Sequence, residues 1–271
     1  MRGSALNSIK ILLFSALAIY IAANLYAYVI QDRLLYFPAH ERLTPRDVGL
    51  ESVQEVTLTT KSGSDFTSWY GRAIPGHATI LFFHGNGGAI AHRDYRFREL
   101  MANGFGIFML GYPGYGGNEG KPSEQSFTET ATVAYEYLLD QKITAEDIVI
   151  YGESIGSGVA VQIAAGNQAR ALILEAPLTS TMDVARVHYP WLLARFLLSD
   201  KFASIDQIDG IQMPLLVIHG DQDTIIPISL GRKLFERASE PKTFVALEGA
   251  GHNDLHRFSV TSIVSDYIET L

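Results

Sequence analysis

The most constraining stretch of this chain is residues 149–158, where an apolar run meets a serine flanked by glycines. Val149-Ile150-Tyr151 is short, apolar and rich in β-branched residues, as expected of a buried strand. Gly152-Glu153-Ser154-Ile155-Gly156 follows at once, and residues 159–165 have the composition of a helix. The pattern predicts a strand, a sharp turn that exposes Ser154 at its apex, and a helix. The alternative is a turn of small residues that only allows a tightly packed helix.

After residue 32, apolar runs alternate with helical patterns. Buried strands are predicted at residues 79–83, 106–110, 149–151, 171–175, 214–218 and 243–247. Residues 53–60 and 66–73 alternate in polarity instead, which predicts a hairpin. Continuously apolar strands separated by helices predict an α/β fold, a mostly parallel sheet covered by helices on both faces. We expect residues 33–271 to form one domain, with a short lid at about residues 178–208.

Residues 1–32 are predicted to be a membrane anchor. No charged side chain occurs from Ile11 to Ile30, and twenty helical residues span the roughly 30 Å of a bilayer core. Arg2 and Lys10 precede this stretch without an acid, which predicts a cytoplasmic N-terminus and a body on the non-cytoplasmic side, periplasmic or lumenal. The alternative is a signal peptide whose cleavage would release the remainder as a secreted protein.

The charge and the cysteine count exclude several classes of function. The formal net charge is −8, which argues against nucleic acid as a partner because phosphate binding needs clustered Lys and Arg. The chain has no cysteine, so disulfides, thiolate catalysis and cysteine-based metal sites are excluded. We expect neither a metal nor an organic cofactor.

Two strand ends besides that of Ser154 carry the side chains that a serine nucleophile needs. Asp223 lies just beyond the strand at 214–218, and His252 follows the last strand in a glycine-rich loop. In parallel sheets, reacting groups gather at the carboxyl ends of the strands, and the chain order Ser, Asp, His is a known one. We therefore predict that His252 takes the proton of Ser154 and that Asp223 orients His252. Asp221 is the alternative acid and His256 the alternative base.

Backbone amides of two turns are candidates for an oxyanion site. One belongs to Ile155, the residue after Ser154, and the other to Asn86 in the loop His84-Gly85-Asn86-Gly87-Gly88. A flexible glycine turn is the alternative for this loop. His84 is expected to support it through a hydrogen bond. His188 and His219 have no evident chemical partner and are taken as structural or surface residues.

The predicted lid contains aromatic and apolar side chains. Tyr189, Trp191 and Leu192 are candidates for an apolar wall of a substrate site, which would favour apolar acyl groups. The alternative is that they pack the lid onto the body.

Taken together, these motifs resemble those of the α/β-hydrolase superfamily. The similarity is closest to its membrane-anchored, serine aminopeptidase-like group of α/β-hydrolase domain-containing proteins. It rests on motifs along the whole chain, namely Arg33-Leu34-Leu35-Tyr36-Phe37-Pro38, the loops at 84–88 and 111–120, Gly152–Gly156, His219–Asp223 with Pro227, and Gly251-His252-Asn253.

The residues and the resemblance together imply a serine hydrolase that acts by acyl transfer. Its substrate is expected to be a small-molecule or lipid ester, as for a carboxylesterase or a lipase-like enzyme. Thioesterase and serine peptidase activities are alternatives within the enzyme class. A membrane-anchored binding protein that is not catalytic is the alternative outside it.

Overall fold

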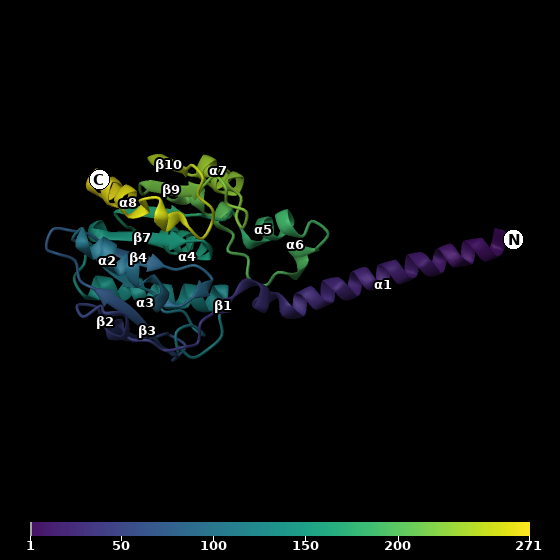
Figure 1. Ribbon diagram of the computed structural model, residues 1–271, viewed down its shortest axis with the longest axis horizontal. Coiled ribbons are helices and arrows are strands. Elements are labelled where there is room, and N and C mark those ends of the chain that lie inside the picture. The colour runs from purple at the N-terminus through teal and green to yellow at the C-terminus, as the bar shows by residue number, and fades with distance from the viewer. Residues whose placement is uncertain (1) are drawn as a thin grey trace.

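The computed structural model describes residues 2–271. A long helix, α1 (Arg2–Leu35), projects from a body that holds the rest of the chain (Figure 1). Within the described residues, one helical stretch, Leu6–Leu35, is long and apolar enough to cross a membrane, with a mean hydropathy of 1.8. Such a stretch is compatible with a membrane anchor or with a signal sequence.

The body is built on an eight-stranded sheet in the order β10-β9-β8-β7-β4-β6-β3-β2. Neighbouring strands from β10 to β6 are parallel, and β2 and β3 form the predicted antiparallel hairpin at one edge. The mostly parallel sheet is thus confirmed. The strands are β2 (Gln54–Thr59), β3 (Asp65–Gly71), β4 (Thr79–Phe83), β6 (Gly106–Met109), β7 (Ile148–Glu153), β8 (Ala171–Glu175), β9 (Leu215–Gly220) and β10 (Lys242–Leu247).

Helices cover both faces of the sheet. In β4, Leu81 and Phe83 face a core packed by α3, α4 and α7, whereas Ile80 and Phe82 face a second core packed by α2 and α8. Both faces are buried, which is why apolar residues occupy successive positions of the central strands rather than every second one. The helices are α2 (Asp94–Ala102), α3 (Glu124–Asp140), α4 (Ile155–Gly166), α5 (Thr181–His188), α6 (Ala194–Leu197), α7 (Ile228–Arg237) and α8 (Val260–Glu269).

A second, two-stranded sheet joins the end of α1 to the loop after β4. β1 (Phe37–Pro38) runs parallel to β5 (Gly87–Gly88), and the Phe37 amide donates to the Asn86 carbonyl at 3.0 Å. This pairing was not predicted, because strands of only two residues leave no pattern in the sequence. Its consequence is that α1 leaves the body beside the loop that follows β4.

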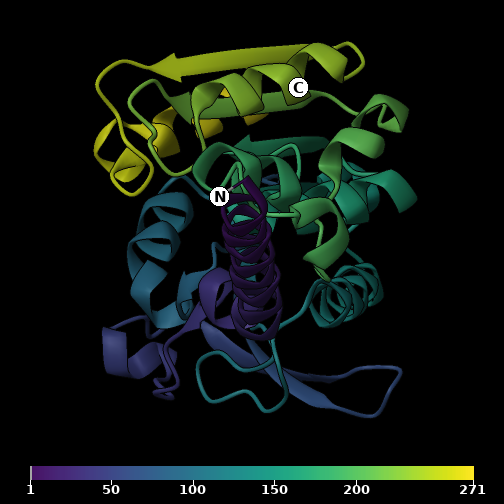
Figure 2. The same ribbon diagram turned by 90° about the vertical axis from the view of Figure 1, so that its right-hand side faces the viewer.

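The segment predicted as a lid, residues 178–208, lies beside α1. It contains α5, α6 and one short 3₁₀ turn at Ser204–Asp206, and α6 contacts α1 directly. Viewed along α1, this segment lies next to the helix at the end of the body from which α1 projects (Figure 2). The loop at the carboxyl end of β4 contains β5, which pairs with β1, so this end of β4 lies beside the end of α1.

Candidate active site

Ser154 sits in a strained turn between β7 and α4. Its φ of 54° and ψ of −121° are unfavourable for a residue with a side chain, and they hold Ser154 at the apex of the predicted turn. Both flanking glycines are required by close contacts. A Cβ on Gly152 would lie 2.4 Å from the carbonyl oxygen of Gly156, and one on Gly156 would lie 2.1 Å from that of Phe83.

The structure brings Ser154, His252 and Asp223 into one hydrogen-bonded chain. Ser154 Oγ lies 2.9 Å from His252 Nε2, and His252 Nδ1 lies 2.7 Å from Asp223 Oδ2. Ser154 is 8% exposed and Asp223 is 6% exposed, so both are largely shielded from water. This order of groups can move a proton from the serine to the imidazole while the carboxylate fixes the ring.

Asp223 is held by four groups: two amides of its own loop, His219 at the end of β9, and His252 in the loop after β10. The amides of Ile225 and Ile226 donate to Oδ1 at 2.9 and 2.8 Å. His219 Nε2 lies 3.3 Å from Oδ2, the oxygen that also contacts His252. Burial opposes ionisation of this carboxyl, but hydrogen bonds from His219 and His252 outweigh it and hold its pKa well below the usual range. Asp223 therefore stays charged beside His252.

His219 is the member of this cluster that sequence reasoning missed. The sequence predicts no chemical partner for His219. The side chain is nevertheless fully buried, and it contacts Asp223 at 3.3 Å and the Ile226 carbonyl at 2.8 Å. Its position at the end of β9, four residues before Asp223, was the available signal. Side-chain reach across the loop decides the contact, and sequence order does not show it.

The alternative acid and base have other partners than Ser154, His252 or Asp223. Asp221 Oδ1 accepts a hydrogen bond from the Gly249 amide at 2.8 Å, as expected of a turn-stabilising carboxylate. The ring of His256 packs against Tyr95 at 5.4 Å between centroids. His188 Nε2 lies 2.8 Å from the carbonyl oxygen of Ile225.

The loop after β4 lies against Ser154. A Cβ on Gly85 would come 3.4 Å from Ser154 Cβ, which shows how closely the loop approaches. Asn86 is fixed by three hydrogen bonds: its carbonyl accepts from the Phe37 amide at 3.0 Å and from Tyr115 Oη at 2.8 Å, and its Nδ2 donates to the Leu35 carbonyl at 2.7 Å. Ile155 is the first residue of α4, where amides have no acceptor within the helix.

Comparison with known proteins identifies the family of this chain. A family model described as serine aminopeptidase, S33, matches residues 75–205. Human α/β hydrolase domain-containing protein 17B is 36% identical over 211 residues, which cover 77% of this chain and 72% of that protein. The chain belongs to the α/β-hydrolase family.

Two further matches extend this assignment. A lysophosphatidylserine lipase of Danio rerio is 31% identical to this α/β-hydrolase over 196 residues, which cover 65% of this chain and 51% of that protein. A solved structure of a Pyrococcus furiosus esterase superposes with a TM-score of 0.69 at 18% identity, covering 87% of this chain and 97% of that one. The second match establishes the α/β-hydrolase fold.

A cavity of about 370 Å³ opens beside Ser154 in this α/β-hydrolase. Its lining is mostly polar and comes from the loop after β4, from α2 and the turn before it, and from the loop of His252. The lining residues are Gly85, Asn86, Gly87, His92, Arg93, Tyr95, Arg96, Glu153, Ser154, Glu175, Ala176, His252, Asn253, Leu255 and His256.

Two arginine–glutamate pairs in this lining were not predicted. Arg93 Nη2 bonds Glu153 Oε1 at 2.8 Å, and Arg96 Nη2 bonds Glu175 Oε1 at 2.6 Å. Burial alone would raise the pKa of Glu153, but the charge of Arg93 overrides it and lowers the pKa to about 2. The Glu153 carboxylate is therefore ionised, and each of the two carboxyl groups is already paired with an arginine.

The predicted substrate residues Tyr189, Trp191 and Leu192 do not line this cavity. Tyr189 and Trp191 are each 50% exposed, and the Trp191 carbonyl accepts a hydrogen bond from Tyr20 of α1. The expected apolar wall beside Ser154 is replaced by the polar lining described above.

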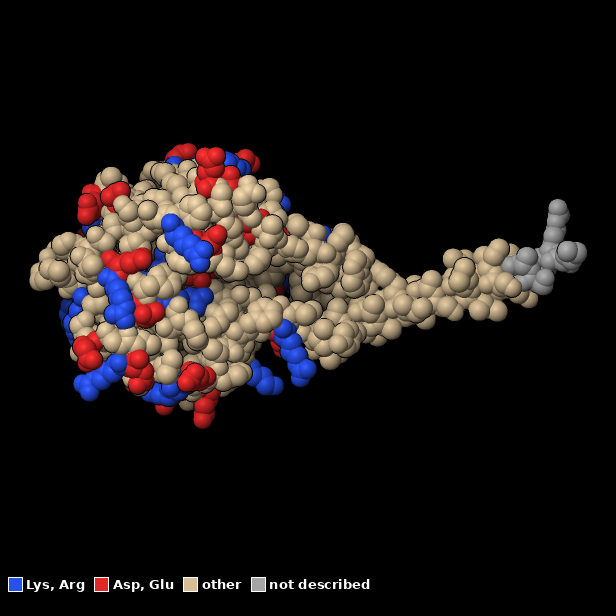
Figure 3. All heavy atoms as spheres, viewed as in Figure 1, with Lys and Arg blue, Asp and Glu red and all other residues tan. Residues whose placement is uncertain are grey.

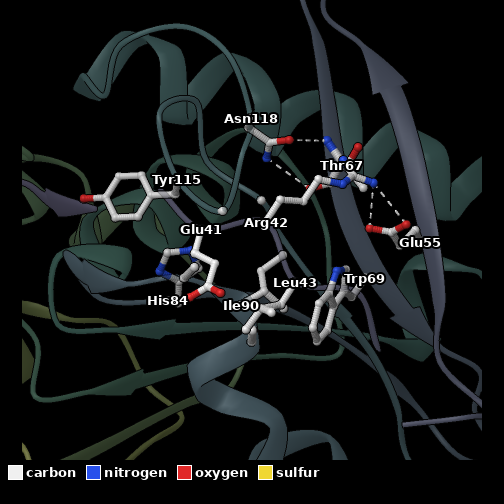
Figure 4. A pocket seen from close by; sticks show the side chains of 14 residues that line it. Glu41, Arg42, Leu43, Glu55, Thr67, Trp69, His84, Ile90, Tyr115 and Asn118 are labelled. Atoms are coloured by element: carbon white, nitrogen blue, oxygen red, sulfur yellow. Dashed lines mark hydrogen bonds and ion pairs between the residues drawn. The ribbon is translucent and has the colours of Figure 1, made fainter. Parts of the chain in front are cut away.

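A smaller hollow of about 20 Å³ lies on the other side of His84, among Glu41, Arg42, Trp69 and Tyr115 (Figure 4). It has the size of a water site and does not reach Ser154. Within residues 2–271, no group of three or more His, Cys, Asp or Glu side chains is arranged to hold a metal ion.

Proposed function

We propose that this α/β-hydrolase cleaves an ester-type acyl bond through a covalent intermediate on Ser154. The observation that carries the proposal is the hydrogen-bonded chain from Ser154 Oγ through His252 to Asp223, at 2.9 and 2.7 Å. Membership of the α/β-hydrolase family supports it, because in this fold a serine on a sharp strand-to-helix turn is the usual nucleophile.

The proposed reaction has two halves. His252 Nε2 takes the proton of Ser154 as Oγ attacks the carbonyl carbon, and Asp223 holds the ring and stabilises its positive charge. The amides of Asn86 and Ile155 donate to the oxyanion of the tetrahedral intermediate. His252 then protonates the leaving alcohol, and water, deprotonated by the same ring, releases the acyl group from Ser154. None of these steps calls on a metal or an organic cofactor.

Esters are favoured over peptides by the charge state of the cavity. An aminopeptidase needs a free carboxylate to bind the substrate's terminal ammonium group. The carboxylates that line the cavity, Glu153 and Glu175, are each paired with an arginine at 2.8 Å or less. The serine aminopeptidase description of the matching family model makes a peptidase the second candidate, and a thioesterase would use the same steps.

We further propose that α1 is retained as a single-pass anchor and that the substrate is a lipid or another amphiphilic ester. Retention is supported by side chains of α1 that bond the body: Gln31 Oε1 accepts from the Ser199 amide at 2.8 Å, and Asn24 Oδ1 accepts from the Leu193 amide at 2.9 Å. The lipase among the relatives supports a lipid substrate. We propose that the body lies on the non-cytoplasmic side, which the positive charges of Arg2 and Lys10 before the span support.

A fluorophosphonate probe tests the proposed nucleophile. The probe phosphonylates serines that are activated by a base, so it should label the full-length wild type and a Ser62→Ala control, whose serine lies in the β2–β3 turn. It should not label Ser154→Ala, and it should label His252→Gln to a much smaller extent than the wild type. Equal labelling of Ser154→Ala, or none of the wild type, would instead indicate a different nucleophile or a binding protein without activity.

A substrate panel separates the candidate activities. p-Nitrophenyl esters of increasing chain length, acyl thioesters and aminoacyl amides are compared by kcat/KM on the same preparation. We expect the esters to be cleaved best. A preference for the amides would favour the peptidase, and a preference for the thioesters would favour the thioesterase.

A further inference from the structure

The end of the body beside α1 carries a row of exposed apolar side chains. Val187, Tyr189, Trp191 and Leu193 belong to residues 187–193, here named the shoulder segment, and each is between 44% and 50% exposed. Charged side chains gather over the sheet and its helices instead. On the face shown in Figure 3, α1 and the part of the body next to it are almost free of them.

The shoulder segment is bonded to the apolar part of α1. Tyr20 Oη donates to the Trp191 carbonyl at 2.9 Å, and the Leu193 amide donates to Asn24 Oδ1 at 2.9 Å. Asn24 is only 4% exposed, and its Nδ2 donates to the Tyr20 carbonyl at 2.9 Å. A polar side chain within an otherwise apolar helix is thus fully satisfied, with the shoulder segment as its partner.

The depth of this attachment follows from the charges on α1. The stretch between Lys10 and Asp32 has no charged residue, and at about 1.5 Å per residue it is roughly 30 Å long, the thickness of the hydrocarbon core. With these two charges at the membrane surfaces, Tyr20 and Asn24 lie roughly 12 to 18 Å inward from Asp32 along the helix. Trp191 and Leu193 of the shoulder segment, which are bonded to them, lie at the same depth.

The chain after the shoulder segment returns to the level of Asp32. The Ser199 amide donates to Gln31 Oε1 at 2.8 Å, and Tyr36 Oη donates to Asp200 Oδ2 at 2.6 Å. Charged residues reappear at this level, beginning with Asp200 and Lys201. Apart from Arg195, the sequence between Arg186 and Asp200 has no permanently charged residue.

We infer that the shoulder segment is immersed in the leaflet next to the body and binds lipid acyl chains as a second membrane contact. The inference rests on the proposed retention of α1 as an anchor. Half-exposed Tyr and Trp side chains suit this position, because their rings are apolar and their polar atoms bond headgroups or water. The occupant of this surface is the bilayer that α1 itself crosses.

Immersion places the Ser154 edge of the sheet against the membrane surface. His188, in the shoulder segment, bonds the carbonyl of Ile225 in the loop of Asp223, and the Leu35 carbonyl at the end of α1 bonds Asn86. The two elements that we place in or at the bilayer thus hold the two loops that flank Ser154. The substrate class that this arrangement serves is an amphiphilic ester that enters from the leaflet rather than from bulk water.

The chain's two tryptophans make a direct test possible. Trp69 is 3% exposed inside the body and Trp191 belongs to the shoulder segment, so full-length Trp69→Phe reports on Trp191 alone. The protein is reconstituted in phosphatidylcholine vesicles whose acyl chains carry bromine at a shallow, a middle or a deep position. We expect the bromine to reduce Trp191 emission, and the vesicles to protect that emission from aqueous iodide.

Trp191→Phe is the matched control, since emission from Trp69 should be the same in brominated and plain vesicles. If Trp69→Phe folds poorly, the difference between wild type and Trp191→Phe gives the same answer. Trp191 emission that is not quenched by bromine but is quenched by iodide would overturn the inference. Protection from both quenchers would also overturn it, because it would place a second copy of the chain on this surface.

The same vesicles separate this inference from the proposals on which it rests. Flotation after alkaline carbonate treatment reports on the anchor, and fluorophosphonate labelling reports on Ser154. A protein that floats and is labelled, but whose Trp191 is not quenched by bromine, retains the anchor and the hydrolase activity without immersion. A protein that does not float loses both the anchor and the immersed segment, whatever its labelling.

Discussion

At the scale of single residues, backbone geometry places Ser154, and its own side chain contributes little to its position. The positive φ of Ser154 is held by glycines on either side, whose missing Cβ atoms let β7, α4 and the end of β4 approach one another. The spacing of these glycines is visible in the sequence, which is why the turn could be predicted. The 2.1 Å approach that makes Gly156 necessary is a tertiary contact.

Gly156→Ala tests this packing. The added Cβ would lie 2.1 Å from the Phe83 carbonyl, so α4 and the loop after β4 must separate. We expect a loss of stability on the order of 1–3 kcal/mol and a loss of fluorophosphonate labelling, measured by thermal unfolding and by gel. Gly166→Ala, in the same helix, is the control, because its Cβ would meet nothing within 4 Å. Equal behaviour of the two variants would contradict the packing argument.

His219 is a positioning residue in this account, acting on Ser154 only through Asp223. His219→Phe removes a hydrogen bond to a buried carboxylate, so we expect kcat to fall by about tenfold. The loss should raise the pKa of Asp223 and loosen the carboxylate that orients His252, so kcat should fall while KM stays near the wild-type value. A rise in KM with kcat unchanged would contradict a role of His219 that acts through Asp223.

At the scale of elements, the central strands were predictable and the attachments of the loops were not. Burial on both faces makes β4, β7, β8 and β9 apolar over most of their length, and that signal is strong in a single sequence. The position of residues 178–208 depends instead on hydrogen bonds to α1 that join residues more than 160 positions apart. No local pattern encodes such contacts, so the segment was predicted as a lid over Ser154.

The pairing of Arg93 with Glu153 links the turn before α2 to the turn of Ser154. Arg93→Met leaves the Glu153 carboxylate largely buried without its partner, which we expect to destabilise the protein by about 3–5 kcal/mol. The double variant Arg93→Met/Glu153→Gln removes the unpaired charge and should recover most of that loss. Chemical denaturation of the detergent-solubilised protein measures both. If the double variant is no more stable than Arg93→Met, the pairing is not the source of the effect.

At the scale of the whole molecule, a buried neutral histidine makes folding sensitive to acid. His84 is fully buried; its Nδ1 bonds the Gly85 carbonyl at 2.7 Å, and its Nε2 has no partner. Burial and the nearby charge of Arg93 lower the pKa of His84 to about 3. Protonation at Nε2 would therefore put an unpaired charged donor in the core.

The sign of the pH effect follows from this lowered pKa. Below about pH 6.5 His84 is protonated in the unfolded chain, whereas in the folded chain it stays neutral down to about pH 3. The free energy of unfolding therefore falls as the pH drops through this window. We expect a loss on the order of a few kcal/mol, which His84→Gln should reduce. Thermal unfolding between pH 7 and pH 4 measures it, with His40→Gln at an exposed histidine as the control. Equal slopes for wild type and His84→Gln would contradict the assignment.

The measurement that tests the central claim most directly is the trapping of an acyl-enzyme on Ser154. The full-length protein is mixed with a p-nitrophenyl ester, quenched in acid within the first turnover and analysed by peptide mass. The account predicts a burst of p-nitrophenol equal to the amount of active enzyme and an acyl group on the peptide that contains Ser154. An ester that is turned over while the acyl group is found on another residue, or on none, would contradict it.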